Sequence, residues 1–222
     1  MAESKNPFNR INIKYSNTTL LTVVVLTIFI IPLLRVSPRL NLLSIAITII
    51  IIIAAASIEK YKNKILLAAI ITIITEWIAD ILGLRFLLLI SIALNIIFFL
   101  FIVFSFIRQV ASAKKVSSTV ILESINGYLM LGLAYAMVVA FIMLIDSNAF
   151  NFTGIDTLDI YKHSSFGNYI YYSFITLTTV GYGDVVPVIP IAKSFSIFIA
   201  LSGQFYLTII MATLISKYIN QR

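Results

Sequence analysis

The stretch Thr178–Asp184 has the composition of a site for a bare cation rather than for a covalent reaction. It reads TTVGYGD, so two glycines alternate with Val180 and Tyr182. Glycine adopts left-handed backbone conformations at little cost, whereas other residues rarely do. Alternating handedness along an extended strand turns successive carbonyl oxygens toward the same side. Several such strands around an axis present rings of oxygen that replace the hydration shell of a cation.

The chain around this stretch is apolar enough to require a membrane. Hydrophobic residues make up 60% of the 222 residues and charged residues only 11%, which is more apolar surface than a soluble fold of this size buries. Six runs are long enough to be read as crossings of a hydrocarbon core about 30 Å thick. They are residues 19–34, 42–57, 65–82, 86–107, 120–145 and 189–219. Pro32 is expected to kink or end the first run.

The residues just before the glycines, 168–177, predict a short helix that enters the membrane from outside and stops partway. Irregular backbone at membrane depth is tolerated only where protein surrounds it or where it lines a watery path. Unpaired carbonyls at the end of the short helix carry partial negative charge and favour a cation just beyond them. The expected fold is an all-α membrane protein with six transmembrane helices and a re-entrant helix and strand between the fifth and sixth.

The basic residues indicate the orientation of the chain in the membrane. With the N-terminus inside, eleven of the sixteen Lys and Arg residues fall in cytoplasmic segments, as the positive-inside rule requires. The other five are Arg35, Arg39, Arg85, Lys162 and Lys193. We therefore expect a multi-pass protein of the plasma or inner membrane, with both termini cytoplasmic and no cleavable signal peptide.

Several function classes are excluded by the same residues. Basic side chains scattered over two membrane sides do not form a nucleic-acid surface. The sequence contains no cysteine and one histidine, and we find no nucleophile–base pair or metal-ligand constellation, so we expect no enzyme.

The motif TTVGYGD resembles the selectivity filter of potassium channels, and the resemblance extends from about residue 116 to 219. It implies an outer helix, a pore helix, a filter and an inner helix. The chain then divides into a cytoplasmic N-terminal segment (1–18), a four-helix transmembrane domain (19–108) and a pore domain (109–222). The implied function is passive, selective transport of K⁺, the permeant ion, with no organic cofactor. The implied assembly is a homotetramer in membrane lipid, since one chain supplies only one strand of a closed ring.

The resemblance also assigns roles to individual residues. The filter is Thr178, Thr179, Val180, Gly181, Tyr182, Gly183 and Asp184. The implied K⁺ ligands are the backbone carbonyls of Thr179, Val180, Gly181 and Tyr182, together with the Thr179 hydroxyl. Tyr182 is expected to point away from the axis.

Two positions near the filter depart from the family pattern. Many relatives have tryptophan where this chain has Tyr171 and Tyr172, whose hydroxyls we expect to support the filter through Asp184 or Tyr182. Ile175 replaces a carboxylate that pairs with the filter aspartate in some relatives, so Asp184 must find another partner.

The inner helix carries the candidates for gating. Gly203 is either a hinge or a close-packing position. Leu207, Met211 and Ile215 recur at i, i+4 and i+8, and this stripe either lines a cavity that closes by dewetting or packs against a neighbouring helix. Gln204 is polar at membrane depth and is expected to find a partner in the bundle interior or in water.

The fourth run predicts weak or absent voltage dependence. No Arg or Lys lies between Arg85 and Arg108, whereas a voltage sensor needs several charges within the membrane field. In the third run, Glu76 and Asp80 are interpreted as a structural ion pair with Arg85 or as remnants of sensor countercharges.

The stimulus that opens the pore is left open by the sequence. The chain ends soon after the sixth run, so we expect no cytoplasmic ligand-sensing domain. Gating by lipid, tension, pH or an unidentified regulatory subunit remains, and His163 is a candidate for titration near neutral pH. Glu123 and Asn126 are candidate partners for the basic linker at 114–115. The alternative functions are a non-selective cation channel and the pore subunit of a K⁺ uptake system.

Overall fold

The structure is a computed structural model of the chain. It describes residues 7–30, 32, 50, 67, 70–71, 74–75, 78, 82, 85–113, 115–152 and 165–220. Within these residues there are five helices with assigned bounds, α1 (Pro7–Phe29), α4 (Arg85–Ser112), α5 (Ser118–Ile145), α7 (Ser165–Leu177) and α8 (Pro190–Ile219). Its strands are β1 (Phe150–Phe152) and β2 (Val185–Pro187). The described part is therefore mostly helical, as expected of an all-α membrane protein.

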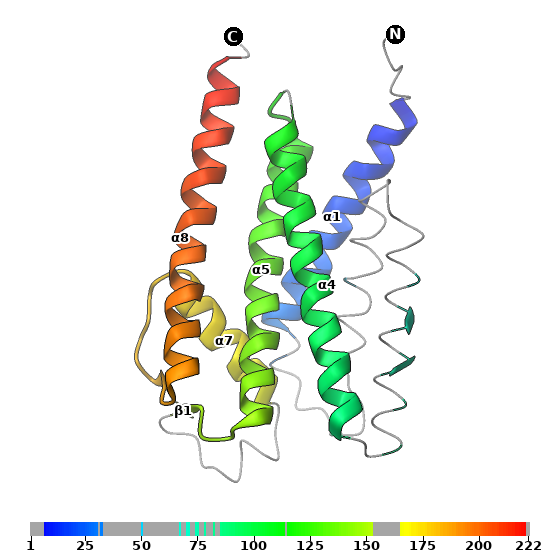
Figure 1. Cartoon of the computed structure of the whole chain (residues 1–222). Helices are drawn as coiled ribbons and strands as arrows, with labels where there is room; N and C mark the ends of the chain where they lie inside the picture. Colours follow the sequence, from blue (N-terminus) through cyan, green and yellow to red (C-terminus); the bar gives the residue numbers. More distant parts are fainter. Residues whose placement is uncertain are drawn as a thin grey trace.

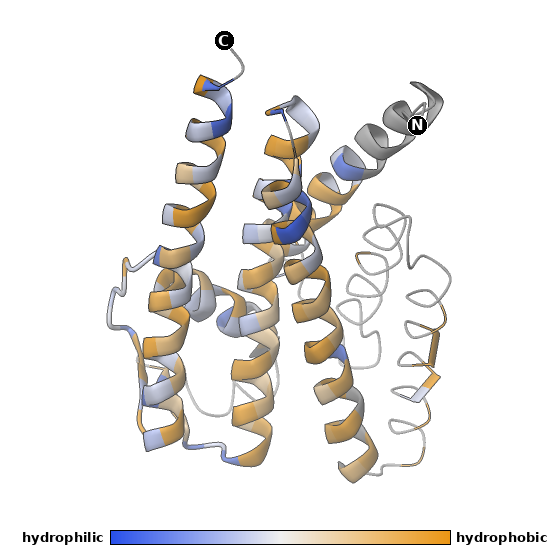
Figure 2. Cartoon of the chain, turned by 45° about the horizontal axis from the view of Figure 1, so that its top comes forward, coloured by the Kyte–Doolittle hydropathy of each residue, from blue (hydrophilic) through white to orange (hydrophobic). Residues whose placement is uncertain are grey.

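The long helices form a bundle whose apolar surface suits a membrane. Ile92–Ser112 within α4, all of α5 and all of α8 are long and apolar enough to cross a bilayer. Figure 2 shows hydrophobic residues along most of α4, α5 and α8. In the single chain less than a third of the apolar span is buried in α4 and in α8, whereas more than half is buried in α5. Helix α1 begins and α8 ends at the same end of the bundle (Figure 1). Among the described residues these are three candidate spans. The run at 42–57 lies almost wholly outside that part of the chain, and most of the run at 65–82 does too.

Helix α1 begins much earlier than hydropathy predicted. The first run was expected at 19–34, but the helix starts at Pro7 and ends at Phe29, before Pro32. Only Asn17–Phe29 is strongly apolar. Hydropathy locates the part of a helix that fits hydrocarbon, and the helix itself continues into polar sequence.

A small antiparallel sheet was not predicted. Strands β1 and β2 pair Asn151 with Val186, and the Val188 N–H donates to the Ala149 carbonyl at 2.9 Å. Three-residue strands are too short to show a periodic pattern, and the described part of the chain is still mostly helical. The sheet fixes the chain that leaves α5 to the chain that leaves the glycine motif.

Helix α7 is seated in a notch on α5 at Gly132. A Cβ at Gly132 would lie 2.6–2.8 Å from ring carbons of Phe174, and the Ser173 hydroxyl donates to the Gly132 carbonyl at 2.7 Å. The absence of a side chain on α5 therefore lets the short helix pack closely. This contact fixes α7 against α5.

Candidate functional site

The backbone after α7 folds back onto the end of the helix. The N–H groups of Val180 and Gly181 both donate to the Ile175 carbonyl, at 2.9 and 3.1 Å, and the Thr179 N–H donates to Thr176 at 3.0 Å. The expectation of unpaired carbonyls at this helix end is therefore wrong for Ile175 and Thr176, whose carbonyls accept these hydrogen bonds. The bonds hold the start of the glycine motif against α7 through its amides.

The carbonyl oxygens of the same strand, unlike its first amides, have no hydrogen-bond partner in the backbone that the structure describes. Within the described residues, the carbonyls from Thr179 to Tyr182 accept no backbone hydrogen bond. In a hydrocarbon environment such groups need a partner, because an unsatisfied carbonyl there costs several kcal/mol. These four carbonyls therefore need a partner other than the backbone that the structure describes.

Every second residue of the strand has a left-handed backbone. The φ angles are +60° at Thr179, +52° at Gly181 and +83° at Gly183. The glycines were predicted to allow this conformation, but Thr179 was not. A β-branched residue at positive φ is a backbone outlier that costs about 1–3 kcal/mol and persists only where its surroundings impose it. Its only sequence clue is its place two residues before Gly181.

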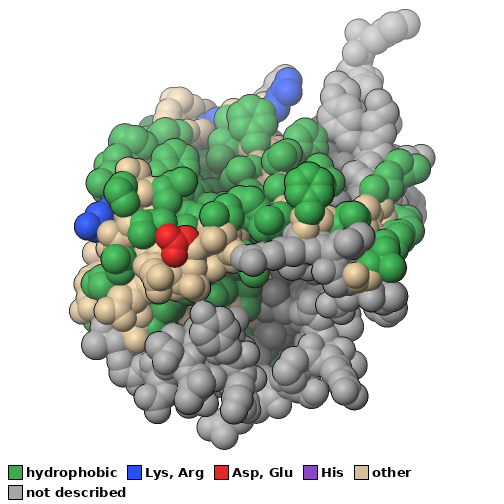
Figure 3. All heavy atoms as spheres, turned by 60° about the horizontal axis from the view of Figure 1, so that its bottom comes forward, with side chains coloured by type: hydrophobic (Ala, Val, Ile, Leu, Met, Phe, Trp, Pro, Cys, Tyr) green, Lys and Arg blue, Asp and Glu red, His purple; other side chains and the backbone are tan. Residues whose placement is uncertain are grey.

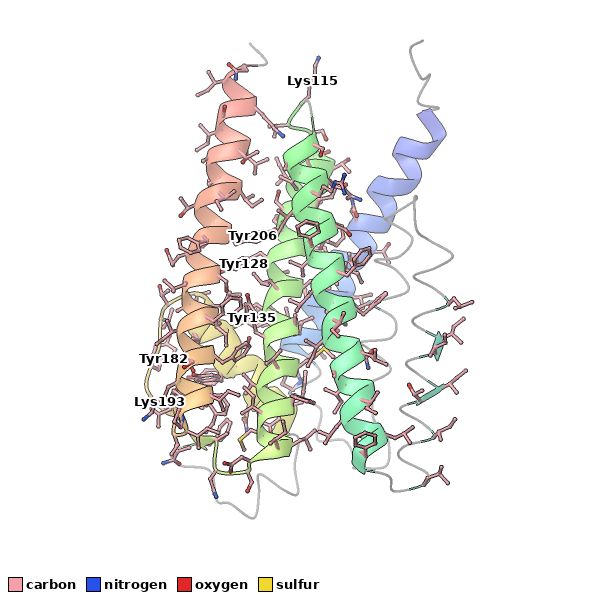
Figure 4. The ribbon with its side chains drawn as sticks, viewed as in Figure 1. Lys115, Tyr128, Tyr135, Tyr182, Lys193 and Tyr206 are labelled. Carbon is pink, nitrogen blue, oxygen red and sulfur yellow. The ribbon has the colours of Figure 1, made fainter. Side chains whose placement is uncertain are left out.

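The strand lies on the surface of the single chain. Val180 is 52% exposed and Tyr182 73%, and a Cβ at Gly181 or Gly183 would meet nothing within 4 Å. Tyr182 lies in the loop at the side of α8 (Figure 4). The two glycines are therefore required by their backbone conformation and not by crowding within the chain.

Asp184 is held by Tyr171. The Tyr171 hydroxyl donates to the Asp184 carboxylate at 2.6 Å, and the Val185 N–H donates to its other oxygen at 3.1 Å. This hydrogen bond, with smaller contributions from desolvation and from the nearby negative charge, raises the pKa of the Tyr171 phenol to about 12. The Tyr171 hydroxyl is thus the side-chain donor that holds Asp184.

Tyr172 has a different environment from its neighbour. Its hydroxyl is bonded to the Ser196 hydroxyl of α8, and its ring lies edge-on to Phe150 with centroids 5.0 Å apart. It joins α7 to the inner helix and to β1. The structure thus separates two tyrosines that the sequence treated as equivalent, since Tyr171 alone contacts Asp184.

The inner helix α8 approaches the strand at Gly203. A Cβ at Gly203 would lie 2.9 Å from Leu177 Cδ1 and closer still to the Leu177 carbonyl oxygen. Close packing is therefore a sufficient reason for this glycine, against the end of α7. The stripe of Leu207, Met211 and Ile215 is exposed in the single chain, where it is available either to a cavity or to a neighbouring helix.

Tyrosines fasten α8 to α5. The Tyr206 hydroxyl donates to the Ser124 carbonyl at 2.7 Å, and the Tyr135 hydroxyl donates to Ser202 at 2.7 Å. Figure 4 shows Tyr128, Tyr135 and Tyr206 between the two helices. These contacts fix the face of α8 that meets α5.

Glu123 and Asn126 face α1 and not the basic linker. Glu123 is buried and accepts from the Asn17 side chain at 3.3 Å, and the Asn126 amide donates to the Asn17 carbonyl at 2.9 Å. Lys115 is exposed. Glu123 and Asn126 were expected to pair with the basic linker, and for Lys115, the linker lysine that the structure describes, this expectation is wrong. Glu76, Asp80, Lys114 and His163 lie outside the described residues.

Lys217 joins α8 to α4, a contact that the sequence did not indicate, since this residue was used there only to orient the chain in the membrane. Its ammonium group donates to the carbonyls of Val110 and Ala111 at 2.8 and 2.6 Å. These carbonyls belong to the last turn of α4, where the helix dipole favours a cation. The end of the inner helix is thereby attached to α4.

The end of the molecule that carries the glycine motif has few charges among its described side chains (Figure 3). Residues 127–220 match a family model described as an ion channel. The match covers α7, the motif, α8 and most of α5, and it supports an ion channel in the membrane and points away from an enzyme. No curated protein and no solved structure gives a significant match.

Proposed function

We propose that the protein is a K⁺-selective channel in which four copies of the Thr178–Asp184 strand surround a common axis. The observation that carries this proposal is the alternation of left-handed φ at Thr179, Gly181 and Gly183. Amides from the start of the strand are bound by α7, while the carbonyls from Thr179 to Tyr182 accept no backbone hydrogen bond among the described residues. A dehydrated cation is the partner that such oxygens lack.

A single chain cannot satisfy these oxygens in a membrane. Side chains of the strand, such as Val180 and Tyr182, and of α8, such as Leu207 and Met211, are exposed in the single chain. Further copies would bury both, and a closed ring gives each copy the same contacts. The homotetramer is therefore part of the proposal.

The deciding experiment is a bi-ionic reversal potential, measured on purified protein in a planar bilayer. With K⁺ on one side and Na⁺ on the other, a K⁺-selective pore should reverse about 59 mV away from zero for each factor of ten by which its K⁺ permeability exceeds its Na⁺ permeability. The non-selective alternative predicts a reversal potential near zero with K⁺ on one side and Na⁺ on the other. The uptake-subunit alternative predicts no current from the purified protein alone.

The variant Gly181→Ala tests the backbone conformation of the strand without disturbing its contacts within the chain. An added methyl group meets nothing within 4 Å in the chain, so packing is preserved, but an L-residue at φ +52° costs about 1–2 kcal/mol in each copy. The variant should assemble, as judged by native mass spectrometry, and lose K⁺ current. Full K⁺ current from this variant would count against a carbonyl-lined path.

A further inference from the structure

Helix α8 contributes a side chain to the base of the candidate filter. The Gln204 side-chain amide donates to the Thr179 hydroxyl oxygen, with Nε2 and Oγ1 3.4 Å apart. Gln204 and Thr179 are both exposed in the single chain, so the contact lies on the surface that α5 does not cover. A polar side chain at this depth in a membrane needs such a partner.

The backbone next to Gln204 explains how it comes so close. Gly203 lies directly against the Leu177 carbonyl, and a side chain at position 203 would separate α8 from α7. Gly203 therefore brings the inner helix within reach of the residue two positions beyond Leu177.

Thr179 is the residue of the strand that most needs external support. It is the one non-glycine among the described residues with positive φ, and its N–H is already bound to Thr176 at 3.0 Å. A hydroxyl oxygen has two lone pairs. A donor from Gln204 occupies one of them and leaves the other for a cation.

We propose that Gln204 is a positioning residue for the innermost cation site, acting through the Thr179 hydroxyl. The inference rests on the proposed K⁺ channel and adds a side chain of the inner helix to its filter. Gln204 restricts rotation of the Thr179 side chain, so that Oγ1 stays directed toward a monovalent cation, or a divalent cation of similar size, at the inner end of the strand.

Binding of Ba²⁺ tests this inference, because Ba²⁺ resembles K⁺ in size and its double charge makes it dwell longer on the same oxygens. Titration calorimetry on the purified assembly measures its affinity without requiring conduction. Gln204→Leu keeps the bulk and removes the donor, and it should weaken Ba²⁺ binding about fivefold, the equivalent of one ordinary hydrogen bond. Gln204→Asn, whose amide is too short to reach, should behave alike. Thr208→Val, one turn further along α8, should bind Ba²⁺ as the unaltered protein does.

A double-mutant cycle separates positioning from a general effect on the pore. In Thr179→Val the hydroxyl is gone, so adding Gln204→Leu should not change Ba²⁺ affinity further. Equal effects of Gln204→Leu with and without the hydroxyl would overturn the inference, as would unchanged binding in both Gln204 variants. If the unaltered protein passes Na⁺ as readily as K⁺, the proposed function fails first. If it selects K⁺ but the cycle shows no coupling, only the role of Gln204 fails.

Discussion

Replacement of Gly203 by alanine distinguishes a hinge from a packing contact by the sign of its effect on stability. In a helix interior alanine is favoured over glycine by about 1 kcal/mol, so a hinge glycine that touches nothing should gain stability when replaced. Here the added Cβ meets the Leu177 carbonyl carbon at 3.0 Å and lies closer to its oxygen. These are backbone atoms that cannot rotate away, so an overpacking cost near the upper end of the usual range, about 3 kcal/mol, applies.

The net expectation is a loss of about 2 kcal/mol per chain, or a fall of about 4–8 °C in the unfolding temperature. Thermal unfolding in detergent, followed by circular dichroism, measures this fall. Ala212→Gly, at a position of the same helix that is exposed in the single chain, reports the propensity effect of a glycine in α8. A higher unfolding temperature for Gly203→Ala, with shorter channel openings and unchanged selectivity, would refute the packing argument and favour the hinge.

Three further predictions follow from other contacts. Gly127→Ala should destabilise the protein by about 1–3 kcal/mol because its methyl group meets the Tyr206 hydroxyl, and Tyr206→Phe should destabilise it by about 1 kcal/mol. In chemical unfolding the double variant should lose less stability than the sum of the two single losses, whereas additive losses would contradict the contact. Tyr171→Phe removes the donor to Asp184 and should speed the decay of K⁺ current during prolonged opening, whereas unchanged decay would argue against a supporting role. The conductance–voltage relation of the purified protein without blocking ions should be shallow, and a steep curve would show a voltage sensor that the fourth run lacks.

Local features of the sequence determined the framework. Predicted ends at residues 145, 177 and 219 agree with α5, α7 and α8, because each coincides with a change from an apolar run to polar or glycine-containing sequence. The left-handed backbone at Gly181 and Gly183 was also predictable, since it depends on the residue type alone. Helix α1 was mislocated because its first half is polar and hydropathy does not report it.

The choice among chemically similar partners was decided only by the tertiary structure. Asp184 pairs with Tyr171 and not Tyr172, Glu123 pairs with Asn17 and not the described linker lysine, and Gln204 reaches Thr179. Thr179 takes a conformation that its residue type disfavours. Each outcome depends on where α1, α7 and α8 pack against α5. The sequence determines which groups need a partner, and the packing of distant segments determines which partner comes within reach.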